Sequence, residues 1–568
     1  MEKRAQPGAG AEAREAGIPP APVVISDLSA CTPQAALSSR RERGRWKLLP
    51  YTASSFAGKC VWALANTGAP ELALPLNARG WHAVYLGLGN EGTGEGNAIR
   101  VKLSGDAAFQ HRGHKHGAGE EVFFRCADLT GQQLHIAQQT AGYPRAACLH
   151  YVKLVPLSAA EAETARRDLQ QREPKRLIGT IDGFSFLYER LPQTREELIE
   201  EFEPYRGTDF GTLWWCISGA DQVNYRSRLG TIDGEHTGDA PRPGDGHFTK
   251  AVQMLIARGI DITQVAVDAC HDMGCDIHIS LRPAAWKGPA PYEEYFTSDF
   301  YDAHPEWRCR DRDGTPVARM SFAVPEVRQH LIGVFREVLE AGPDGLNVLY
   351  NRGVPLVLWE DAFCRRFREL HGEDARQVPE DDPRILDLRA EFMTQWMRDV
   401  RELLDRSREE RKLDRRLALS AMCLETEEDN RKFGLDVARW VREGLIDQIG
   451  IYRGACHASG KPIDLAYYKR ITADTGVPVH PGMVAWALPK AEDVLKQAVE
   501  WYDAGADGLL FWDPSAKVTD GLLWPIISCM GHATETRARA SEKPEPVTFE
   551  IRGVGDDPPS RWSAWAGF

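Results

Sequence analysis

The chain has 568 residues, of which 43% are hydrophobic and 27% are charged, so it is long enough to form two or three domains with hydrophobic cores. Its formal net charge is -13, and this acidic balance argues against nucleic-acid binding, which needs a basic field. No apolar run approaches the roughly 20 residues that cross a bilayer, so no membrane-spanning segment is expected.

The N-terminal segment 1–48 is rich in Ala, Pro, Gly, Glu and Arg without a sustained apolar period, and we predict a flexible tail. Its first residues contain no apolar run typical of a signal peptide, so we expect no secretory signal. Most of the 12 cysteines lie inside apolar runs, which favours buried thiols and a cytoplasmic protein. Their even number leaves disulfides open as an alternative.

Short β-type runs separated by Gly- and Asn-containing turns follow in residues 49–157, among them "WHAVYLGLG", "AIRVKL" and "EEVFFRCADL". Several short strands at this spacing predict an all-β sandwich domain. The loop "HRGHKHGAG" carries His111, His114 and His116, for which a solvated hairpin tip is a better interpretation than a metal site.

Residues 158–175 predict an exposed helical connector, and strand and helix patterns then alternate through residues 176–535. Eight such units predict a closed (β/α)8 TIM barrel with an inserted loop at 219–260. A doubly wound open sheet is the alternative, disfavoured because no Gly-rich phosphate loop follows a strand. The segment 536–568 is predicted to be a C-terminal tail that docks on the sandwich. The eight predicted strands are "RLIGTIDGFSF", "FGTLWWCIS", "DIHISLRP", "GLNVLYNR", "RLALSAMCLE", "DQIGIYR", "VPVHPGMVAW" and "DGLLFWD".

Functional side chains of such a barrel come from the carboxyl ends of its strands. These ends carry acids, amides, guanidinium groups and aromatic rings, which suit a sugar because rings stack on its C–H faces and polar groups bind its hydroxyls. No zinc helix, nucleophilic Ser elbow or phosphate loop is found, so neither a metal nor a cofactor is expected. The predicted substrate-binding residues are Asp182, Asn224, Tyr225, Arg282, Tyr350, Asn351, Arg352, Tyr452, Arg453, His480, Trp486, Trp512 and Asp513.

Glu360 and Glu425 are the predicted catalytic pair, because two carboxyl groups are the minimum for glycosidic bond cleavage. We expect Glu360 to be the acid and Glu425 the base or nucleophile. Each has a structural alternative: Glu360 could start the following helix, and Glu425 begins an acidic run typical of a solvated helix start. Arg352 could pair with a buried acid, Asp182 could cap a turn, and Trp512 could be packing.

Four segments resemble bacterial glycoside hydrolases of the family-10-like glycosyl hydrolase type: "TLWWCISG", "HPEWRCRDRDGTPVARMSFAVPEVR", "DGLNVLYNRGVPLVLWE" and "GADGLLFWD". The likeness covers roughly residues 176–530 and contains no short diagnostic motif. It implies a TIM barrel that acts on carbohydrate. The chain departs from the pattern of related chains at Asn347, where Asp is frequent, and it has no carboxylate at the end of the seventh strand.

The sequence thus predicts a glycoside hydrolase that acts on an oligosaccharide or glycoside. Two alternatives remain open: a catalytically silent carbohydrate-binding barrel, and a sugar lyase or isomerase with His480 as a base. The sugar, the linkage and the oligomeric state are not determined by the sequence.

Overall fold

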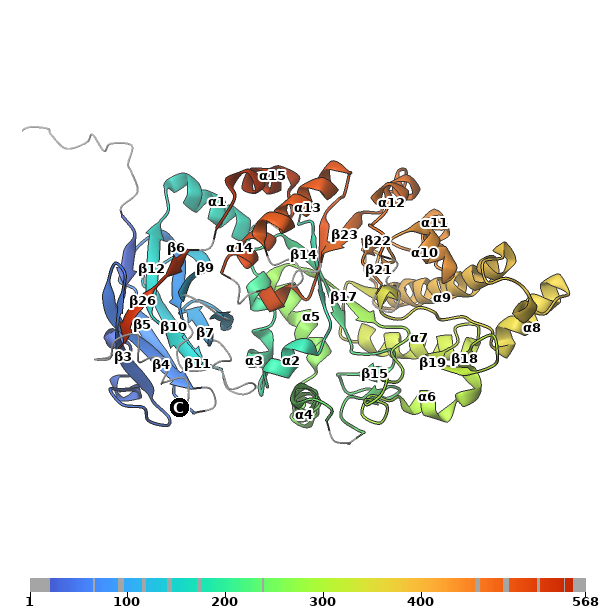
Figure 1. The fold of residues 1–568 in the computed structure, drawn as a ribbon, viewed down its shortest axis with the longest axis horizontal. Helices are drawn as coiled ribbons and strands as arrows, with labels where there is room; N and C mark the ends of the chain where they lie inside the picture. Colours follow the sequence, from blue (N-terminus) through green and yellow to red (C-terminus); the bar gives the residue numbers. More distant parts are fainter. Residues whose placement is uncertain are drawn as a thin grey trace, which may run out of the picture.

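The computed structural model describes residues 21–64, 67–89, 97–114, 119–139, 146–170, 175–236, 240–454, 460–483, 490–517, 521–545 and 547–554. A β-rich part and a barrel lie side by side in it (Figure 1). Among these residues no helix combines the length and apolarity that crossing a membrane needs.

The β-rich part contains two largely antiparallel sheets. The first is five-stranded, in the order β1 (Val23–Ile25), β12 (Tyr151–Pro156), β6 (Trp81–Leu88), β9 (Gly119–Asp128) and β25 (Thr548–Phe549). The second is nine-stranded, in the order β2 (Leu37–Ser38), β3 (Trp46–Ala53), β4 (Ala57–Leu64), β11 (Ala146–Leu149), β7 (Asn97–Leu103), β10 (Gln133–Gln138) and β5 (Leu72–Pro75), with β8 (Gln110–His114) on β7 and β26 (Ile551–Val554) on β3.

Both sheets contribute to one hydrophobic core, to which β6 supplies Val84 and Leu86 and β7 supplies Ile99 and Val101. Two sheets that share a core agree with the predicted sandwich. Its boundaries differ from the prediction, because β1 and β2 lie in the segment 1–48 that we expected to be a flexible tail. Strands β1 and β12 are paired, so the described part of that segment belongs to the sheets.

The C-terminal segment returns to the β-rich part, as predicted for a docking tail. Strand β25 pairs with β9 of one sheet, and β26 pairs with β3 of the other. In Figure 1 this last strand, drawn in red, lies among the blue strands of the N-terminal part.

Eight parallel strands form the closed barrel, one from each run predicted as a strand. This confirms the predicted barrel and excludes the open sheet. In order around the barrel, the strands are β13 (Leu177–Ile181), β14 (Phe210–Cys216), β17 (Asp276–Leu281), β20 (Gly345–Leu349), β21 (Ala418–Cys423), β22 (Gln448–Ile451), β23 (Val479–Met483) and β24 (Leu509–Trp512).

Helices and short strands fill the connections outside the barrel (Figure 1). The predicted connector holds α1 (Ala159–Gln170). The expected insertion after β14 contains β15 (Gln222–Val223) and β16 (Thr231–Ile232), and β18 (Arg308–Arg310) and β19 (Pro316–Met320) form a second insertion after β17. The remaining helices are α2 (Ser185–Glu189), α3 (Arg195–Ile199), α4 (Pro243–Ala257), α5 (Ile262–Met273), α6 (Asp299–Ala303), α7 (Pro325–Leu339), α8 (Asp361–His371), α9 (Pro383–Glu410), α10 (Glu427–Lys432), α11 (Val437–Arg442), α12 (Leu465–Thr472), α13 (Ala491–Asp503), α14 (Leu523–Ile527) and α15 (Ala533–Glu542).

Alternate residues of each barrel strand face the helices and the barrel interior. On β14, Leu213 and Trp215 belong to the core between strands and helices, whereas Trp214 and Cys216 belong to a separate cluster inside the barrel. The same inner cluster contains Tyr452 and Trp512. This alternation decides which strand-end side chains reach the barrel mouth.

A buried polar layer crosses the barrel interior. The Ser420 hydroxyl lies 2.9 Å from Nδ1 of His278 and accepts a 2.8 Å hydrogen bond from Nδ2 of Asn347. Burial lowers the pKa of His278 to about 4, so the imidazole is neutral there at physiological pH. Asn347 is therefore part of the barrel interior.

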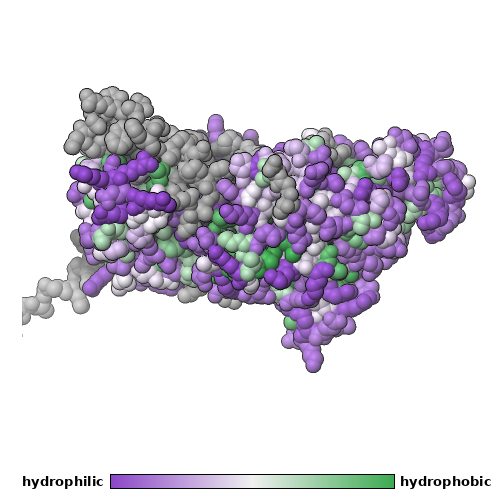
Figure 2. Space-filling view, turned by 90° about the horizontal axis from the view of Figure 1, so that it is seen from below, coloured by the Kyte–Doolittle hydropathy of each residue, from purple (hydrophilic) through white to green (hydrophobic). Residues whose placement is uncertain are grey.

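The two parts of the molecule meet at a buried ion cluster. Glu200, which follows α3, accepts a 2.9 Å hydrogen bond from Nε of Arg100 on β7 and lies 2.8 Å from Nε2 of His111 on β8. His111 therefore lies in the contact with the barrel, not at the solvated hairpin tip that we predicted. The side chain of His114 and all of His116 lie outside the described residues. The outer face shown in Figure 2 is mainly hydrophilic, with hydrophobic residues in small groups.

Candidate active site

Two acids meet where the first and last barrel strands end side by side. Asp182 directly follows β13, Asp513 directly follows β24, and these strands are paired in parallel. The backbone N–H of Asp182 donates a 3.0 Å hydrogen bond to Oδ1 of Asp513, and the N–H of Asp513 donates to the carbonyl of Thr180. Closure of the barrel therefore brings together two residues that are 331 positions apart.

The Asp182 carboxylate is held by the turn that follows it. Its Oδ1 accepts hydrogen bonds from the N–H groups of Phe184 and Ser185, and its Oδ2 accepts one from the Ser185 hydroxyl. Gly183, which lies between Asp182 and Phe184, has φ +78°, and a Cβ there would lie 1.9 Å from the Cys216 carbonyl oxygen. Only glycine fits this turn. The turn-capping role considered for Asp182 is thus present in the structure.

Asp513 lies in a site that disfavours its charged form. Burial raises the pKa of this carboxyl well above its ordinary value, and the charge of Asp182 raises it further. The hydrogen bond from Asp182 N–H and the charges of Arg282 and Arg352 oppose this rise. Its backbone has φ +44°, a left-handed conformation uncommon outside glycine. A protonated carboxyl group beside a second acid is suited to donating a proton.

Two arginines border these acids. Arg282 directly follows β17, its Nη2 lies 3.9 Å from Oδ2 of Asp182, and its Nε and Nη2 are buried without a hydrogen-bond partner among the described residues. Arg352 ends the short helix after β20 and lies 4.9 Å above the Trp512 ring. Burial and the charge of Arg282 lower the pKa of Arg352. Two neighbouring cations, of which Arg282 has unused buried donors, suit a ligand that is rich in oxygen acceptors.

Two aromatic rings lie on the inner side of the same region. Tyr452 follows β22, and its ring centroid lies 5.4 Å from that of Trp512, the last residue of β24. Both side chains are almost completely buried inside the barrel. Trp512 thus packs inside the barrel, which agrees with the alternative that it is a packing residue. Its ring also contacts Arg352.

Two predicted amides have unused hydrogen-bonding capacity. Nδ2 of Asn351 and its Oδ1 are buried and have no hydrogen-bond partner among the described residues. Asn224 donates from Nδ2 to the carbonyls of Gly183 and Cys216, so it fastens the turn after β13 to the end of β14. Buried polar atoms without partners are uncommon, and they often mark the position of a ligand or an ordered water.

Sequence reasoning missed Asp233, which lies on the insertion after β14. Burial raises the pKa of its carboxyl to about 8, while a hydrogen bond with Ser218 and the charge of Arg282 oppose the rise. Its Oδ2 is buried without a hydrogen-bond partner among the described residues. Asp233 lies far from the end of any predicted barrel strand in the sequence, so the strand-end rule could not identify it.

Glu360 lies in a different environment from Asp182 and Asp513. Its Oε1 accepts a 2.5 Å hydrogen bond from the Ser321 hydroxyl, and its Oε2 accepts one from the N–H of Leu358. Burial raises the pKa of Glu360, as expected for an acid catalyst, and these hydrogen bonds oppose the rise. The carboxyl group joins the end of β19 to the start of α8, which agrees with the alternative of a helix-start residue.

Glu425 follows β21 by two residues and is buried. Its Oε2 accepts a hydrogen bond of 3.3 Å from the N–H of Gly454, and its backbone carbonyl accepts one from Asp464. Glu425 thus lies on the side of the barrel mouth formed by β21 and β22. The carboxyl group of Glu360 is instead hydrogen-bonded in the loop before α8, so the two glutamates have different surroundings.

Two predicted tyrosines face away from the barrel interior. The Tyr350 hydroxyl lies 3.0 Å from Sδ of Met397 on α9, and its ring packs 5.5 Å from Trp440 on α11. The Tyr225 hydroxyl donates to Oε2 of Glu337 on α7. Both side chains pack against helices, so the interpretation of these tyrosines as substrate-binding residues is corrected.

His480 lies at the opposite end of the barrel from the acid pair. It is the second residue of β23, and a Cβ on Gly508, which precedes β24, would lie 2.8 Å from its Cδ2. Burial lowers the pKa of His480 to about 4, and the nearby charges are Asp507, Lys469 and Arg176. The expectation that His480 ends its strand at the mouth is therefore corrected.

Two other predicted substrate-binding residues remain. Arg453 is exposed, and Trp486 lies outside the described residues.

The histidine and cysteine residues of α5, of the turn after it and of β17 do not form a common site. His271 lies 3.0 Å from Oδ2 of Asp344, Cys275 donates from Sγ to the carbonyl of Phe210, and His278 points into the barrel. In the described part of the chain, the one group of three side chains with metal-ligating spacing consists of residues of the β-rich part.

No protein-family model matches the chain, and a search of curated proteins found no match. Among similar solved structures is an α-galactosidase from Thermus thermophilus in complex with p-nitrophenyl α-D-galactopyranoside, with 13% identity over 87% of this chain and 94% of that chain and a TM-score of 0.31. A ruminal GH26 endo-β-1,4-mannanase has 9% identity over 91% of this chain and 95% of that chain, with a TM-score of 0.29.

A noncanonic maltogenic α-amylase from Thermotoga neapolitana has 12% identity over 61% of this chain and 68% of that chain, with a TM-score of 0.30. At such TM-scores the similarity does not establish a shared fold or activity. The barrel is established by the strand order of this chain itself.

Proposed function

We propose that this protein is a glycoside hydrolase, in line with the family-10-like resemblance of its sequence, and that Asp513 and Asp182 are its catalytic acids. One observation carries the proposal: two carboxyl groups meet at the carboxyl ends of paired barrel strands, and one of them has a strongly raised pKa. Two acids in unequal environments are the equipment that glycosidic cleavage needs.

Asp513 is the proton donor in this proposal. Its raised pKa keeps the carboxyl protonated at a pH where an ordinary Asp, with a pKa of about 3.9, is ionised. Protonation of the glycosidic oxygen makes the departing sugar a better leaving group. When Asp513 loses that proton, the charge of Arg352 favours the resulting carboxylate.

Asp182 is the partner carboxylate. Three hydrogen bonds from its own turn fix its orientation, and Arg282 lies at ion-pair distance. Such a group can stabilise positive charge on the sugar ring or activate water. Glu425 is the second candidate for the base, because it is buried at the same end of the barrel.

Substrate recognition is proposed to come from the groups around the acids. The buried, unpartnered atoms of Arg282 and Asn351 offer hydrogen bonds to sugar hydroxyls. Arg352 offers a second guanidinium, and the rings of Tyr452 and Trp512 offer apolar surface. Every one of these residues was among the predicted substrate-binding set.

A catalytically silent carbohydrate-binding barrel is the second candidate function. One observation favours it: both oxygens of Asp182 already accept hydrogen bonds inside their own turn, which is a structural role. The lyase or isomerase alternative loses its candidate base, because His480 lies at the other end of the barrel.

A substrate screen with purified full-length protein separates these functions. Aryl glycosides and natural oligosaccharides are incubated with wild type and with Asp513→Asn, and reducing sugar and unsaturated product are both measured. Hydrolysis that is lost in Asp513→Asn supports the proposal. Binding by calorimetry without turnover supports the silent barrel, and an unsaturated product contradicts both.

The leaving group tests the role of Asp513 directly. Asp513→Asn should slow natural glycosides far more than activated aryl glycosides, because a good leaving group needs little protonation. Glu360→Gln serves as the comparison. If Glu360→Gln, and not Asp513→Asn, shows this dependence on the leaving group, the acid is Glu360 and the assignment made here is wrong.

A further inference from the structure

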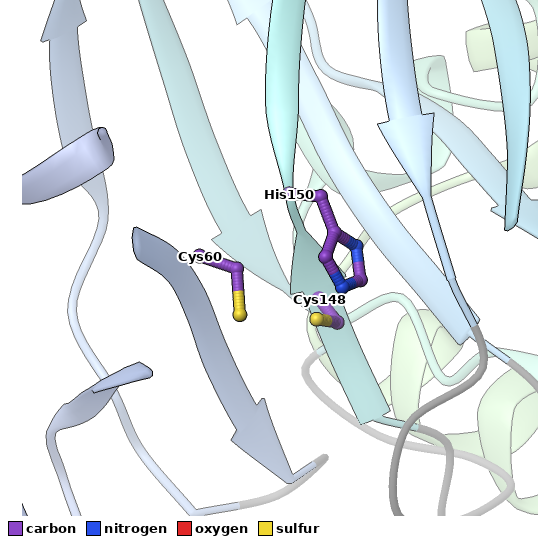
Figure 3. Close-up of side chains that lie close together, drawn as sticks. All are labelled: Cys60, Cys148 and His150. Carbon is purple, nitrogen blue, oxygen red and sulfur yellow. The ribbon is translucent and has the colours of Figure 1, made fainter. Parts of the chain in front are cut away.

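Cys60, Cys148 and His150 gather in the β-rich part of the molecule (Figure 3). One ligand atom from each, two sulfurs and a ring nitrogen, all lie within 4.8 Å of one another. All three side chains are completely buried. This cluster is separate from the acids at the barrel mouth and is not used by the proposed reaction.

Strand register explains the convergence. The ladder between β11 and β4 pairs Cys148 with Trp62 and ends with Leu149 opposite Val61. Cys60 lies two residues before Trp62 on β4 and so shares its face. His150, the next residue after this ladder, donates from its backbone N–H to the carbonyl of Gly87 on β6, and its side chain converges with those of Cys60 and Cys148. The cluster is therefore a product of the Cys-Leu-His spacing and the register.

The cluster lies on the side of β4 and β11 that is turned away from the shared core. Val61 and Leu149 point into that core, whereas Cys60 and Cys148 pack in a second group with Tyr51. The ring of His150 contacts those of Tyr51 and Phe549, with centroids 5.0 Å and 5.6 Å away. Tyr51 also donates from its hydroxyl to the carbonyl of His150, which fixes the backbone there.

Phe549 belongs to β25, and Ile551 of β26 packs against the same group. The returning C-terminal segment therefore covers the cluster. Buried cysteines often serve only as small apolar side chains, so burial alone does not indicate a metal site. The ring of His150 packs against Tyr51 and Phe549 and also adds a nitrogen donor within 4.8 Å of the two sulfurs, which apolar packing of the thiols does not require.

Two thiolates and one imidazole are the donors that soft ions prefer. Zn²⁺ binds sulfur at about 2.3 Å and nitrogen at about 2.0 Å, so its ligand atoms lie roughly 3.5–4 Å apart in a tetrahedral site. The observed spacing needs only a small contraction to reach this geometry. Cu(I) accepts thiolate ligands as well, whereas Mg²⁺ and Ca²⁺ require oxygen ligands that this cluster lacks.

We propose that Cys60, Cys148 and His150 bind one thiophilic ion, Zn²⁺ or Cu(I), which joins β4 to β11 beneath the C-terminal strands. On binding, each thiol releases its proton to solvent and forms a sulfur–metal bond, while the imidazole binds in its neutral form. No electron is transferred. The ion acts as a structural clamp, because a metal that binds only the folded state stabilises it.

The test uses full-length protein purified under a reductant and stripped of metal. Zn²⁺, Cu(I) and, as an optical probe, Co²⁺ are titrated separately, and bound metal is measured by elemental analysis. We expect one equivalent per chain, a thiolate-to-cobalt charge-transfer band, and a higher Tm with the physiological ion. The ion that binds more tightly in direct competition identifies the site as a zinc or a copper site.

Variants test whether Cys60, Cys148 and His150 are the residues that bind the metal. The double variant Cys60→Ala/Cys148→Ala should lose the equivalent of metal, the band and the Tm increase. His150→Gln should keep the thiolate band but bind at least about tenfold more weakly, since one of three ligands is lost. The matched control Cys31→Ala/Cys423→Ala removes two other fully buried thiols and should retain all three signals.

Three results would overturn the proposal. They are the absence of stoichiometric metal in wild type, a charge-transfer band that survives in the double variant, and a disulfide between Cys60 and Cys148 that persists in protein purified under the reductant. The first and third are read on wild type, so the proposal remains testable even if the double variant does not fold.

Discussion

Two buried acids of the same barrel, Glu360 and Asp513, have raised pKa values for the same first reason, burial, yet their surroundings differ. The oxygens of Glu360 are satisfied by a hydroxyl and a backbone N–H from adjacent loops. Asp513 instead lies beside a second acid, Asp182, and within the field of two arginines.

The difference shows that a raised pKa alone does not identify a catalytic acid. Structural carboxyl groups are also buried, but their partners are complete. Near Asp513, Arg282 keeps buried donors without hydrogen-bond partners among the described residues. Unused polar groups next to a protonated acid indicate a place for a substrate, and the four predictions below test this comparison.

The largest expected effect is that of Asp513→Asn. Loss of the proton donor should lower kcat on natural glycosides by roughly 10²–10⁴-fold, the usual contribution of general acid catalysis. The Tm should fall little, because Asn keeps an oxygen to accept the hydrogen bond from Asp182 N–H. Steady-state kinetics and thermal unfolding of the same preparation provide the check. Full activity in this variant would contradict the assignment of Asp513 as the catalytic acid and of Glu360 as a structural one.

Arg352→Lys should have the next largest effect. Lys keeps the charge but loses the planar fork, so kcat/KM should fall by roughly 10–100-fold, as for the loss of a hydrogen bond involving a charged group. Arg366→Lys, at an exposed ion pair with Glu369, is the control and should leave the rate unchanged. A lower Tm with normal activity per folded molecule would show that Arg352 supports the fold and does not bind substrate.

Glu360→Ala should affect stability and not activity. Removal of this acceptor leaves the Ser321 hydroxyl and the Leu358 N–H without their partner, which should lower the free energy of unfolding by about 1–3 kcal/mol. Denaturant unfolding measures this loss, and activity per folded molecule should remain within about twofold of wild type. A large loss of activity at unchanged stability would return Glu360 to the catalytic role predicted from the sequence.

The fourth prediction concerns the pH dependence of stability through Asp233, which leaves activity out of the comparison. Its pKa is about 8 in the folded protein and about 3.9 when unfolded, so between these values the folded state binds more protons. The free energy of unfolding should therefore fall as the pH rises from about 4 to about 8. Asp233→Asn should flatten this part of the Tm profile, whereas the exposed Asp387→Asn should not. Identical profiles for wild type and Asp233→Asn would contradict the buried-acid assignment.

The sequence predicted the barrel well because each strand is a distinct run of apolar residues between helical patterns. The eight predicted runs contain the eight barrel strands. Asp182, Arg282, Arg352 and Asp513, on which the proposed site depends, had all been selected from the sequence as strand-end residues. The contact between two acids at the barrel mouth was not predicted. Glu360 and Glu425 were chosen as the catalytic pair, whereas the contact between Asp182 and Asp513 arises only because the last strand pairs with the first.

Tyr350 and Tyr452 show the physical limit of local sequence. Each tyrosine directly follows a barrel strand, yet Tyr350 packs against Met397 on the helix side and Tyr452 lies inside the barrel beside Trp512. Strands of a parallel barrel are apolar on both faces, so their sequence has no polar alternation that marks the inner face. The inner residues follow from the register of each strand against its neighbours.

Local patterns of apolar residues and turns were thus enough to determine where strands and helices form and which polar residues follow the strands. Only the tertiary structure decided which of these residues meet, because strand register and barrel closure depend on contacts between distant parts of the chain. The same holds in the β-rich part. Cys60 and Cys148 are far apart in sequence, and the pairing of β4 with β11 brings them to His150.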